Sequence, residues 1–263
     1  WKAFAQPKAP KSKLKIGYVS PDFRDHSMNP FFSCILSHHN HDKFEIFAFA
    51  ELENEDMVSQ EYKSYVDHWI RTDGMKDDEL VQKIRSLGID ILVDLAGHTT
   101  NNRLNIFAQK PAPVSLSWWG GYGYTTGLSA IDYFLTDKTM APDGCEHLFS
   151  EKLWKLDFDA EVWDPGERNN MGQVNNLPAL SKGFITFGTL TRAIRINDRV
   201  IKAWADILTK VPNSKLIINS KNFLTTSFRN FHQKDSEAID ELRKKFKDHG
   251  ISESRLDFYY ETP

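Results

Sequence analysis

Short apolar runs alternate with amphipathic segments along residues 14–157. The β-prone runs lie at residues 16–19, 43–50, 89–95, 114–119 and 131–135. Segments with helical periodicity separate most of them, at residues 31–36, 56–69, 76–87 and 102–109. Asn29 is expected to cap the first helix, with Pro30 at its first position. Alternation at this spacing favours a mainly parallel sheet covered by helices, so the pattern predicts an α/β lobe over residues 14–157.

A second α/β pattern follows a polar segment. Residues 158–181 are rich in Asn, Gly and Pro and are expected to form an inter-lobe linker. Beyond it, the pattern predicts strands at 183–190, 215–219 and 256–260 and helices at 198–211 and 235–249. Three strands and two helices are few for a doubly wound domain, so residues 182–263 are predicted to be an incomplete second lobe. Residues 1–13 carry several lysines and two prolines, which is typical of a basic linker.

Composition narrows the class of protein. Hydrophobic content of 40% and a charged fraction of 26% are ordinary for a globular protein. The net charge of −3 gives no indication of nucleic-acid binding, and no apolar run approaches membrane-spanning length. Two cysteines, Cys34 and Cys145, lie far apart without metal-like spacing. We therefore expect a cytoplasmic protein that binds neither nucleic acid nor membrane.

Two patterns raise the question of a metal site. Three histidines follow the first predicted helix, at 38, 39 and 41, but neither Cys nor carboxylate stands at a supporting spacing. Histidines at a helix C-terminus are favoured by the helix dipole without any metal. Asp157 and Asp159 match a short Asp-x-Asp pattern, but this pair opens a polar segment rather than a tight strand end. The sequence therefore predicts no metal site.

Polar loops follow four of the predicted strands, at residues 21–29, 97–102, 120–127 and 189–197. In open α/β sheets, ligands bind beyond the carboxyl ends of strands. His26 lies in the first loop among carboxylates, where it is either a base near pH 7 or a solvated side chain. His98 lies in the second loop, and it either faces the same crevice or caps the helix that follows.

The third and fourth loops suggest sugar and phosphate chemistry. Tyr122 and Tyr124 stand among glycines, and they either form a flat aromatic surface for a sugar or peptide or pack on a neighbouring tryptophan. In the fourth loop, two arginines and two threonines precede a predicted helix N-terminus. Guanidinium groups bind phosphate oxygens bidentately, so a diphosphate would fit there. The alternative is that the two arginines pair with acidic residues across the lobe interface.

Several motifs resemble the catalytic region of protein O-linked N-acetylglucosamine transferases, and the SPINDLY-like bacterial relatives fit best. The matching segments are collinear, at residues 15–26, 91–99, 107–113, 125–128, 132–137, 187–197 and 211–214. The resemblance implies a GT-B-like α/β fold, with two Rossmann-like lobes and a cleft between them. It also implies an inverting, metal-independent glycosyltransferase that moves N-acetylglucosamine from UDP-N-acetylglucosamine to Ser or Thr of proteins. No other cofactor is expected.

The resemblance also assigns roles to residues. His26 matches the active-site histidine of the family, and Arg195 stands where many members carry a lysine that contacts the donor diphosphate. The donor-binding residues expected in this chain are Thr189, Thr191, Arg192 and Arg195, and His98, Thr99, Tyr122, Thr125 and Thr126 are expected on the acceptor side. Tetratricopeptide repeats are expected upstream, and the remaining donor-binding segment beyond residue 263. This stretch alone is therefore expected to be inactive.

A second interpretation remains open at this level. The chain is alternatively a non-catalytic α/β fragment that binds a protein partner or a nucleotide without turnover. The donor sugar, the acceptor protein, the general base and the oligomeric state do not follow from the sequence.

Overall fold

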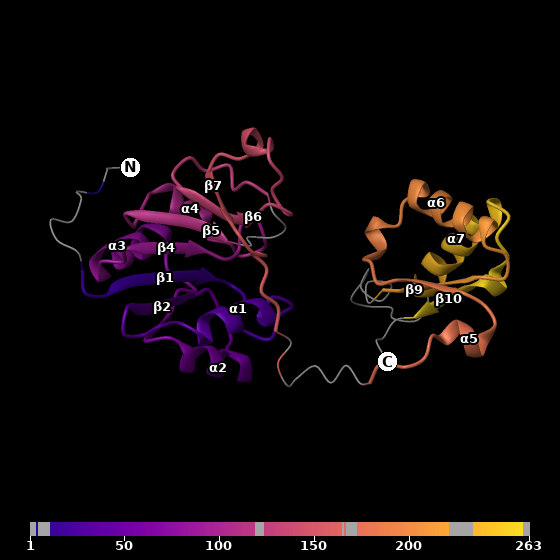
Figure 1. The fold of residues 1–263 in the computed structure, drawn as a ribbon, viewed down its shortest axis with the longest axis horizontal. Helices are drawn as coiled ribbons and strands as arrows, with labels where there is room; N and C mark the ends of the chain where they lie inside the picture. The colour runs from indigo at the N-terminus through magenta and orange to yellow at the C-terminus, as the bar shows by residue number, and fades with distance from the viewer. Residues whose placement is uncertain are drawn as a thin grey trace. The chain divides into compact units, whose positions relative to one another are not determined.

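The computed structural model describes residue 4 and residues 11–118, 124–164, 166, 173–220 and 234–259. Its contacts divide the chain into two compact units, Trp1–Asn170 and Met171–Pro263. Each unit is an α/β structure built on its own sheet (Figure 1). No helix in the described parts of the chain is both long and apolar enough to cross a membrane.

The first unit contains a seven-stranded sheet in the order β3-β2-β1-β4-β5-β6-β7. Every neighbouring pair is parallel. The strands are β1 (Leu14–Ser20), β2 (Phe44–Ala50), β3 (His68–Arg71), β4 (Ile91–Asp94), β5 (Val114–Trp118), β6 (Tyr133–Asp137) and β7 (Lys152–Leu156). The helices are α1 (Asn29–Ser37), α2 (Met57–Tyr65), α3 (Asp77–Leu87) and α4 (Leu104–Ala108), with a 3₁₀ turn, η1, at Glu146–Leu148.

Helices cover both faces of this sheet. Because side chains alternate along a strand, Ile46 and Ala48 of β2 pack into the core under α1 and α2. Phe47 and Phe49 of the same strand pack into the opposite core, under α3 and α4. The predicted mainly parallel α/β architecture is therefore confirmed for this unit.

Gly17 allows the close packing of β1 against its neighbours. A Cβ atom built on Gly17 would lie 2.8 Å from Phe49 Cε2 and 3.1 Å from Leu92 Cδ1. The side chains of Phe49 and Leu92 are fully buried, so they have little room to move aside. Glycine at this position therefore allows β1, the strand that precedes the His26 loop, to pack closely against the core residues under α3.

Two local predictions about this unit are wrong, and one strand was not predicted. The helix expected over residues 56–69 ends at Tyr65, because Val66 is extended (φ −120°, ψ 153°) and the chain then pairs with β2 as strand β3. Asn29 is the first residue of α1 rather than its cap, and the N-cap is Met28. Strand β7 was not predicted. This edge strand is defined by its pairing with β6, which the local sequence does not reveal. Pairing with distant segments overrode local periodicity in each strand.

The second unit contains a three-stranded parallel sheet in the order β10-β9-β8. The strands are β8 (Thr186–Thr189), β9 (Lys215–Asn219) and β10 (Leu256–Tyr259). The helices are α5 (Pro178–Lys182), α6 (Asp198–Lys210) and α7 (Lys234–Asp248), and 3₁₀ turns η2 and η4 lie at Ala193–Arg195 and Glu253–Arg255. Ile201 and Leu208 of α6 pack with Ile218 of β9 in a core of their own. Helix α5 was not predicted.

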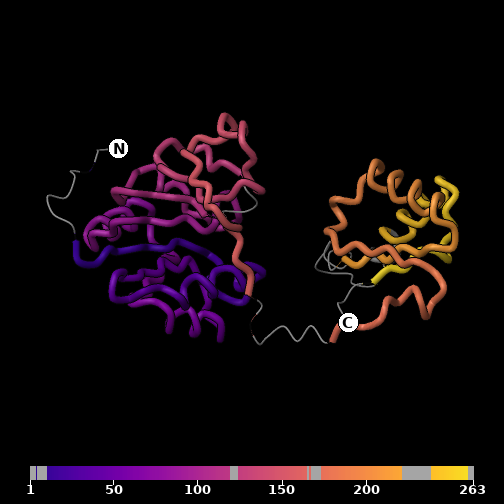
Figure 2. The backbone as a smooth tube through the Cα atoms, in the orientation of Figure 1, coloured from indigo at the N-terminus to yellow at the C-terminus, as the bar shows by residue number. Residues whose placement is uncertain are grey.

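Residues 157–164 form a strap on the first unit. The N–H of Ala160 donates to Asp137 Oδ2 (2.8 Å) at the end of β6, and its carbonyl accepts from Trp118 Nε1 (3.2 Å) at the end of β5. The N–H of Asp164 donates to the Pro30 carbonyl (2.9 Å) in α1. The chain therefore returns from β7 to the start of α1 (Figure 2). The part of the predicted linker up to residue 164 belongs to the first unit.

Candidate functional site

The strand order of the first unit places its switch point between β1 and β4. From β1 the sheet continues through β2 and β3, and from β4 it continues through β5, β6 and β7. Ligands of open α/β sheets bind beyond the carboxyl ends of the strands at such a point. The loop that follows β1 carries His26, and the loop that follows β4 carries His98. The two loops predicted to converge therefore follow adjacent, hydrogen-bonded strands.

His26 has a neighbour at each ring nitrogen. Nδ1 accepts a hydrogen bond from the N–H of Met28 (3.3 Å), and Nε2 lies 3.6 Å from Asp22 Oδ1. The side chain is 33% exposed, so the ring is reachable from solvent while part of it is covered. Since a lone pair on Nδ1 faces the Met28 N–H, the neutral ring carries its proton on Nε2, toward the carboxylate.

Asp22 is the buried partner of this histidine. The residue is 7% exposed, and Arg24 Nη2 lies 3.7 Å from the same Oδ1 that faces His26. Burial raises the pKa of the Asp22 carboxyl, while the charges of His26 and Arg24 lower it. Sequence reasoning named Asp22 only as a neighbour. The spacing of four residues between Asp22 and His26 was the signal that could have identified the pair.

Asp94 holds the loop that carries His98. It ends β4, is 1% exposed, and accepts from the N–H groups of Ala96 (3.1 Å) and Gly97 (3.0 Å) and from Ser117 Oγ (2.9 Å). Desolvation raises the pKa of this carboxyl. Ser117 belongs to β5, so one carboxylate joins the ends of two strands. Sequence reasoning did not single out Asp94, although a carboxylate between an apolar strand and a glycine was a usable signal.

His98 itself is exposed, whereas the hydroxyl of Thr99 is committed to its own loop. Thr99 Oγ1 donates to the Ala96 carbonyl (2.8 Å) and closes the turn. The alternative that His98 caps the next helix is wrong. Helix α4 begins at Leu104, and Asn102 Oδ1 accepts the Leu104 N–H (3.2 Å).

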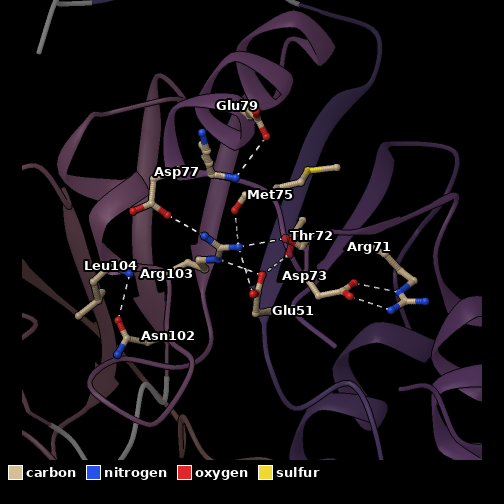
Figure 3. A network of polar contacts seen from close by, with 11 residues as sticks. Glu51, Arg71, Thr72, Asp73, Met75, Asp77, Glu79, Asn102, Arg103 and Leu104 are labelled. Carbon is tan, nitrogen blue, oxygen red and sulfur yellow. Dashed lines mark hydrogen bonds and ion pairs between the residues drawn. The ribbon is translucent and has the colours of Figure 1, made fainter. Parts of the chain in front are cut away.

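Arg103, in the loop that follows β4, forms hydrogen bonds with three other segments of the chain (Figure 3). Its guanidinium pairs with Glu51 beyond β2 and with Asp77 of α3, at 2.9 and 2.7 Å. It also donates to the carbonyls of Thr72 and Met75, which follow β3. The loop after β4 is thereby tied to the ends of both β2 and β3.

The two threonines expected on the acceptor side bond to a buried glutamate. Thr126 donates to Glu151 through both its N–H (2.7 Å) and its hydroxyl, and Thr125 Oγ1 donates to the same carboxylate (2.7 Å). Glu151 directly precedes β7, at the amino ends of the parallel strands, whereas His26 and His98 follow carboxyl ends. The structure thus does not group Thr125 and Thr126 with the histidines. Tyr122 lies outside the described residues.

The predicted donor-binding residues lie at the start of the second unit. Thr189 ends β8, Thr191 and Arg192 follow it, and Arg195 lies in η2. Both arginines are exposed, and neither has an ion-pair partner among the described residues of this unit. The alternative that they pair with acidic residues across the lobe interface stays a prediction, because contacts within this unit do not test it. Exposed guanidinium groups without a partner are available to an anion.

The N-terminus of α6 carries a side-chain cap and an ion pair with α7. Asn197 Oδ1 accepts the Val200 N–H (3.1 Å) and caps the helix. Asp198, in the first turn, pairs with Lys245 (3.0 Å). The positive charge that this region offers to a phosphate thus comes mainly from the arginines that precede the helix.

The histidines near the end of α1 bond to three different groups. His38 Nδ1 contacts the Cys34 carbonyl (2.7 Å), His39 Nε2 contacts Tyr18 Oη (2.8 Å), and His41 Nδ1 contacts Asp67 (3.1 Å). In the described part of the chain, no group of three His, Cys, Asp or Glu side chains could hold a metal ion.

Comparison with known proteins decides the family. Residues 2–171 match the model of glycosyl transferase family 41. The chain belongs to this family. The matched residues include the His26 loop, the Asp94 loop and the strap of the first unit.

Curated relatives of this family 41 chain carry related names. The chain is 36% identical over 226 residues to a Solanum lycopersicum protein named probable UDP-N-acetylglucosamine--peptide N-acetylglucosaminyltransferase SPINDLY. It is 32% identical over 211 residues to the Arabidopsis thaliana protein of the same description named SEC. These matches cover 84% and 78% of this chain but 24% and 22% of the relatives. The family 41 chain thus spans about a quarter of the length of the relatives it matches.

A solved structure agrees with this assignment. A variant of the Thermobaculum terrenum O-GlcNAc transferase superposes with a TM-score of 0.83 at 27% sequence identity. The match covers 95% of the family 41 chain and 45% of that protein. It confirms both the predicted family resemblance and the predicted GT-B-like α/β fold, with a partial second lobe.

Proposed function

We propose that this family 41 chain is part of an enzyme that transfers N-acetylglucosamine from UDP-N-acetylglucosamine to Ser or Thr hydroxyls of proteins. The observation that carries the proposal is the family match over residues 2–171, which includes the His26 loop. The names of the SPINDLY and SEC relatives support the same donor and a peptide acceptor. The relatives are about four times longer, so the activity belongs to the complete protein.

The proposed reaction is an inverting displacement without a metal. The acceptor hydroxyl attacks the anomeric carbon, the bond from that carbon to the diphosphate breaks, and UDP leaves with the electron pair. Arg195 and Arg192 bind the diphosphate oxygens and stabilise the charge that develops on them. His26 positions the acceptor hydroxyl or takes its proton, and a phosphate oxygen of the donor is the alternative base. Thr189 and Thr191 donate hydrogen bonds to the donor.

The setting of the enzyme is also part of the proposal. We place tetratricopeptide repeats upstream of this chain and the rest of the donor-binding lobe downstream, so this stretch alone has no transferase activity. The location is cytoplasmic, and neither nucleic acid nor membrane is a partner. The free cysteines Cys34 and Cys145 are compatible with a reducing compartment.

The proposal is tested by sugar transfer with the full-length protein. Peptide libraries are glycosylated from a panel of nucleotide sugars, and UDP-N-acetylglucosamine is expected to be preferred. Arg195→Ala is expected to lower kcat/KM by about 10²–10³-fold, because one positioned donor to developing charge contributes that much. Arg195→Lys should recover part of the rate. Lys202→Ala removes an exposed cation of α6 that pairs with Asp206, and it is the matched control.

Several outcomes bear on separate parts of this proposal. Absence of transfer by the folded full-length protein, with retained UDP binding, would favour the non-catalytic alternative. Unchanged turnover in Arg195→Ala would remove that residue from the mechanism. An inverted anomeric configuration in the product and full activity in a chelator would support the inverting and metal-independent course.

A further inference from the structure

We propose that Asp22 is a positioning residue for sugar transfer, which holds the proton of neutral His26 on Nε2 and leaves Nδ1 as the ring atom that receives the acceptor proton. This inference rests on the proposed transferase function. It goes beyond the family match, because that match assigns no role to any single side chain.

The geometry fixes which nitrogen carries the proton. Nδ1 faces a backbone N–H, that of Met28, and a donor can only face a lone pair. Nε2 faces Asp22 Oδ1 at 3.6 Å, and a carboxylate oxygen is an acceptor. The Met28 contact therefore requires hydrogen on Nε2, and the Asp22 carboxylate lies on the side of the ring where this hydrogen stands. The Nε2 contact is long for a hydrogen bond, as is common in catalytic groups without substrate.

The surroundings of Asp22 hold its carboxylate in place. Its N–H donates to Ser20 Oγ (3.0 Å), the last residue of β1, and its side chain is covered by protein. On the same loop, Arg24 lies close to the same oxygen. From the neighbouring α2, the cap residue Asp56 accepts the Asp25 N–H (2.7 Å) and fixes the loop between Asp22 and His26. A covered carboxylate on a fixed loop is suited to orient an imidazole.

In the proposed step, His26 takes the proton of the acceptor hydroxyl and Asp22 accepts a hydrogen bond from the resulting imidazolium. The acceptor oxygen forms a bond to the anomeric carbon while its proton moves to His26 Nδ1, and the bond to the UDP oxygen breaks with the electron pair. The Met28 N–H contact, at 3.3 Å, is at the long end of the hydrogen-bond range and yields to the hydroxyl. The resulting imidazolium donates from Nε2 to Asp22. The carboxylate stays ionised throughout and needs no proton of its own.

The first experiment is a double-mutant cycle in the full-length enzyme. His26→Ala is expected to lower kcat by about 10²–10⁴-fold, the usual contribution of a proton-transfer group. Asp22→Asn, which keeps the shape but removes the charge, should lower kcat by about 10–10²-fold, a share of that contribution, with little change in KM. The double variant should be no slower than His26→Ala alone, because Asp22 acts through His26. Asp25→Asn, an exposed carboxylate of the same loop, is the control.

The second experiment reads the tautomer directly. Long-range ¹H–¹⁵N spectra of the 263-residue chain at a pH where His26 is neutral should show its proton on Nε2. In Asp22→Asn the Nε2-protonated tautomer should lose part of its population, because only the Met28 N–H then selects it, while the backbone spectrum elsewhere is unchanged. This measurement does not depend on enzymatic activity.

The results separate this inference from the proposed function. Absence of any sugar transfer by the wild-type protein would overturn the function, while the tautomer would still test the Asp22–His26 contact. An active enzyme in which Asp22→Asn and His26→Ala have additive effects would overturn the inference alone. So would a proton on Nδ1 in the wild-type spectrum, or a His26→Ala variant with unchanged kcat.

Discussion

At the scale of single residues, His39 links the stability of the first unit to pH. His39 follows the end of α1, and its Nε2 forms a hydrogen bond with Tyr18 Oη (2.8 Å). Burial lowers the pKa of His39 and the charge of His41 lowers it further, whereas Asp67 opposes the shift. The folded protein therefore keeps this imidazole neutral at a pH where the unfolded chain protonates it.

The expected result is a loss of stability in mild acid. The unfolded chain begins to bind a proton at His39 near its usual value of 6.5, while the folded state does so only at lower pH. The free energy of unfolding should thus fall as the pH drops from about 6.5 to the lowered pKa of the folded state. Urea titrations between pH 8 and 5 measure this slope. His39→Gln should reduce it.

The control is His38→Gln, since His38 is exposed at the same helix end. Equal slopes in the wild type and His39→Gln would contradict the account. Asp67 contributes separately. Burial opposes ionisation of this carboxyl, but hydrogen bonds from Ile46 and His41 dominate and lower its pKa. The contribution of Asp67 to the free energy of unfolding is therefore lost only in stronger acid.

At the scale of elements, Arg103 joins the ends of three strands of the sheet. One guanidinium contacts residues beyond β2 and β3 and the first residue of α3, while its backbone precedes α4 (Figure 3). Removing it would leave the Glu51 carboxylate, 16% exposed, without its charged partner. Breaking such a covered pair costs more than an exposed pair contributes.

Arg103→Gln is therefore expected to lower the free energy of unfolding by about 2–4 kcal/mol. Arg85→Gln is the matched control, because Arg85 is exposed and donates mainly to the Gln109 carbonyl, and it should cost about 1 kcal/mol or less. Tryptophan fluorescence during urea unfolding reports the first unit, since every tryptophan except Trp204 precedes residue 171. Equal losses in the two variants would show that the network adds nothing beyond ordinary surface bonds.

Element boundaries followed the sequence where local signals decided them. Helix α3 was predicted at residues 76–87 and observed at Asp77–Leu87, because its apolar face is periodic and Gly88 ends it with φ of 66°. The helix expected over 56–69 failed only over residues 66–69. There, the N–H of Thr72 and the chain before it bond to β2, a partner that local periodicity does not reveal.

At the scale of the whole molecule, the two units have separate and unequal cores. The first has seven strands with a core on each face, whereas the described part of the second has three strands and one core. Large apolar side chains are also exposed on the second unit, among them Leu180, Leu190 and Ile194. We therefore expect the second unit to be the less stable of the two.

Limited proteolysis of the 263-residue chain tests this expectation. Cleavage within residues 181–263 should precede cleavage within residues 14–157, because local opening is more frequent in the unit with the smaller core. Mass spectrometry of the fragments over time gives the order. Fragments that retain residues 181–263 intact after the first unit is digested would contradict it.

The sequence by itself determined the alternation of strands and helices, the family and the loops that carry His26, His98, Arg192 and Arg195. These features are local, since periodicity, turn residues and collinear motifs are read within short windows. The tertiary structure alone decided which loops are neighbours. It set β1 beside β4, committed Thr125 and Thr126 to Glu151, and returned the strap to α1. Strand order and long-range hydrogen bonds depend on segments far apart in the chain, which local patterns do not reveal. The pairing of His26 with Asp22 is a local contact between residues four apart, but the burial of that carboxylate comes from the tertiary packing.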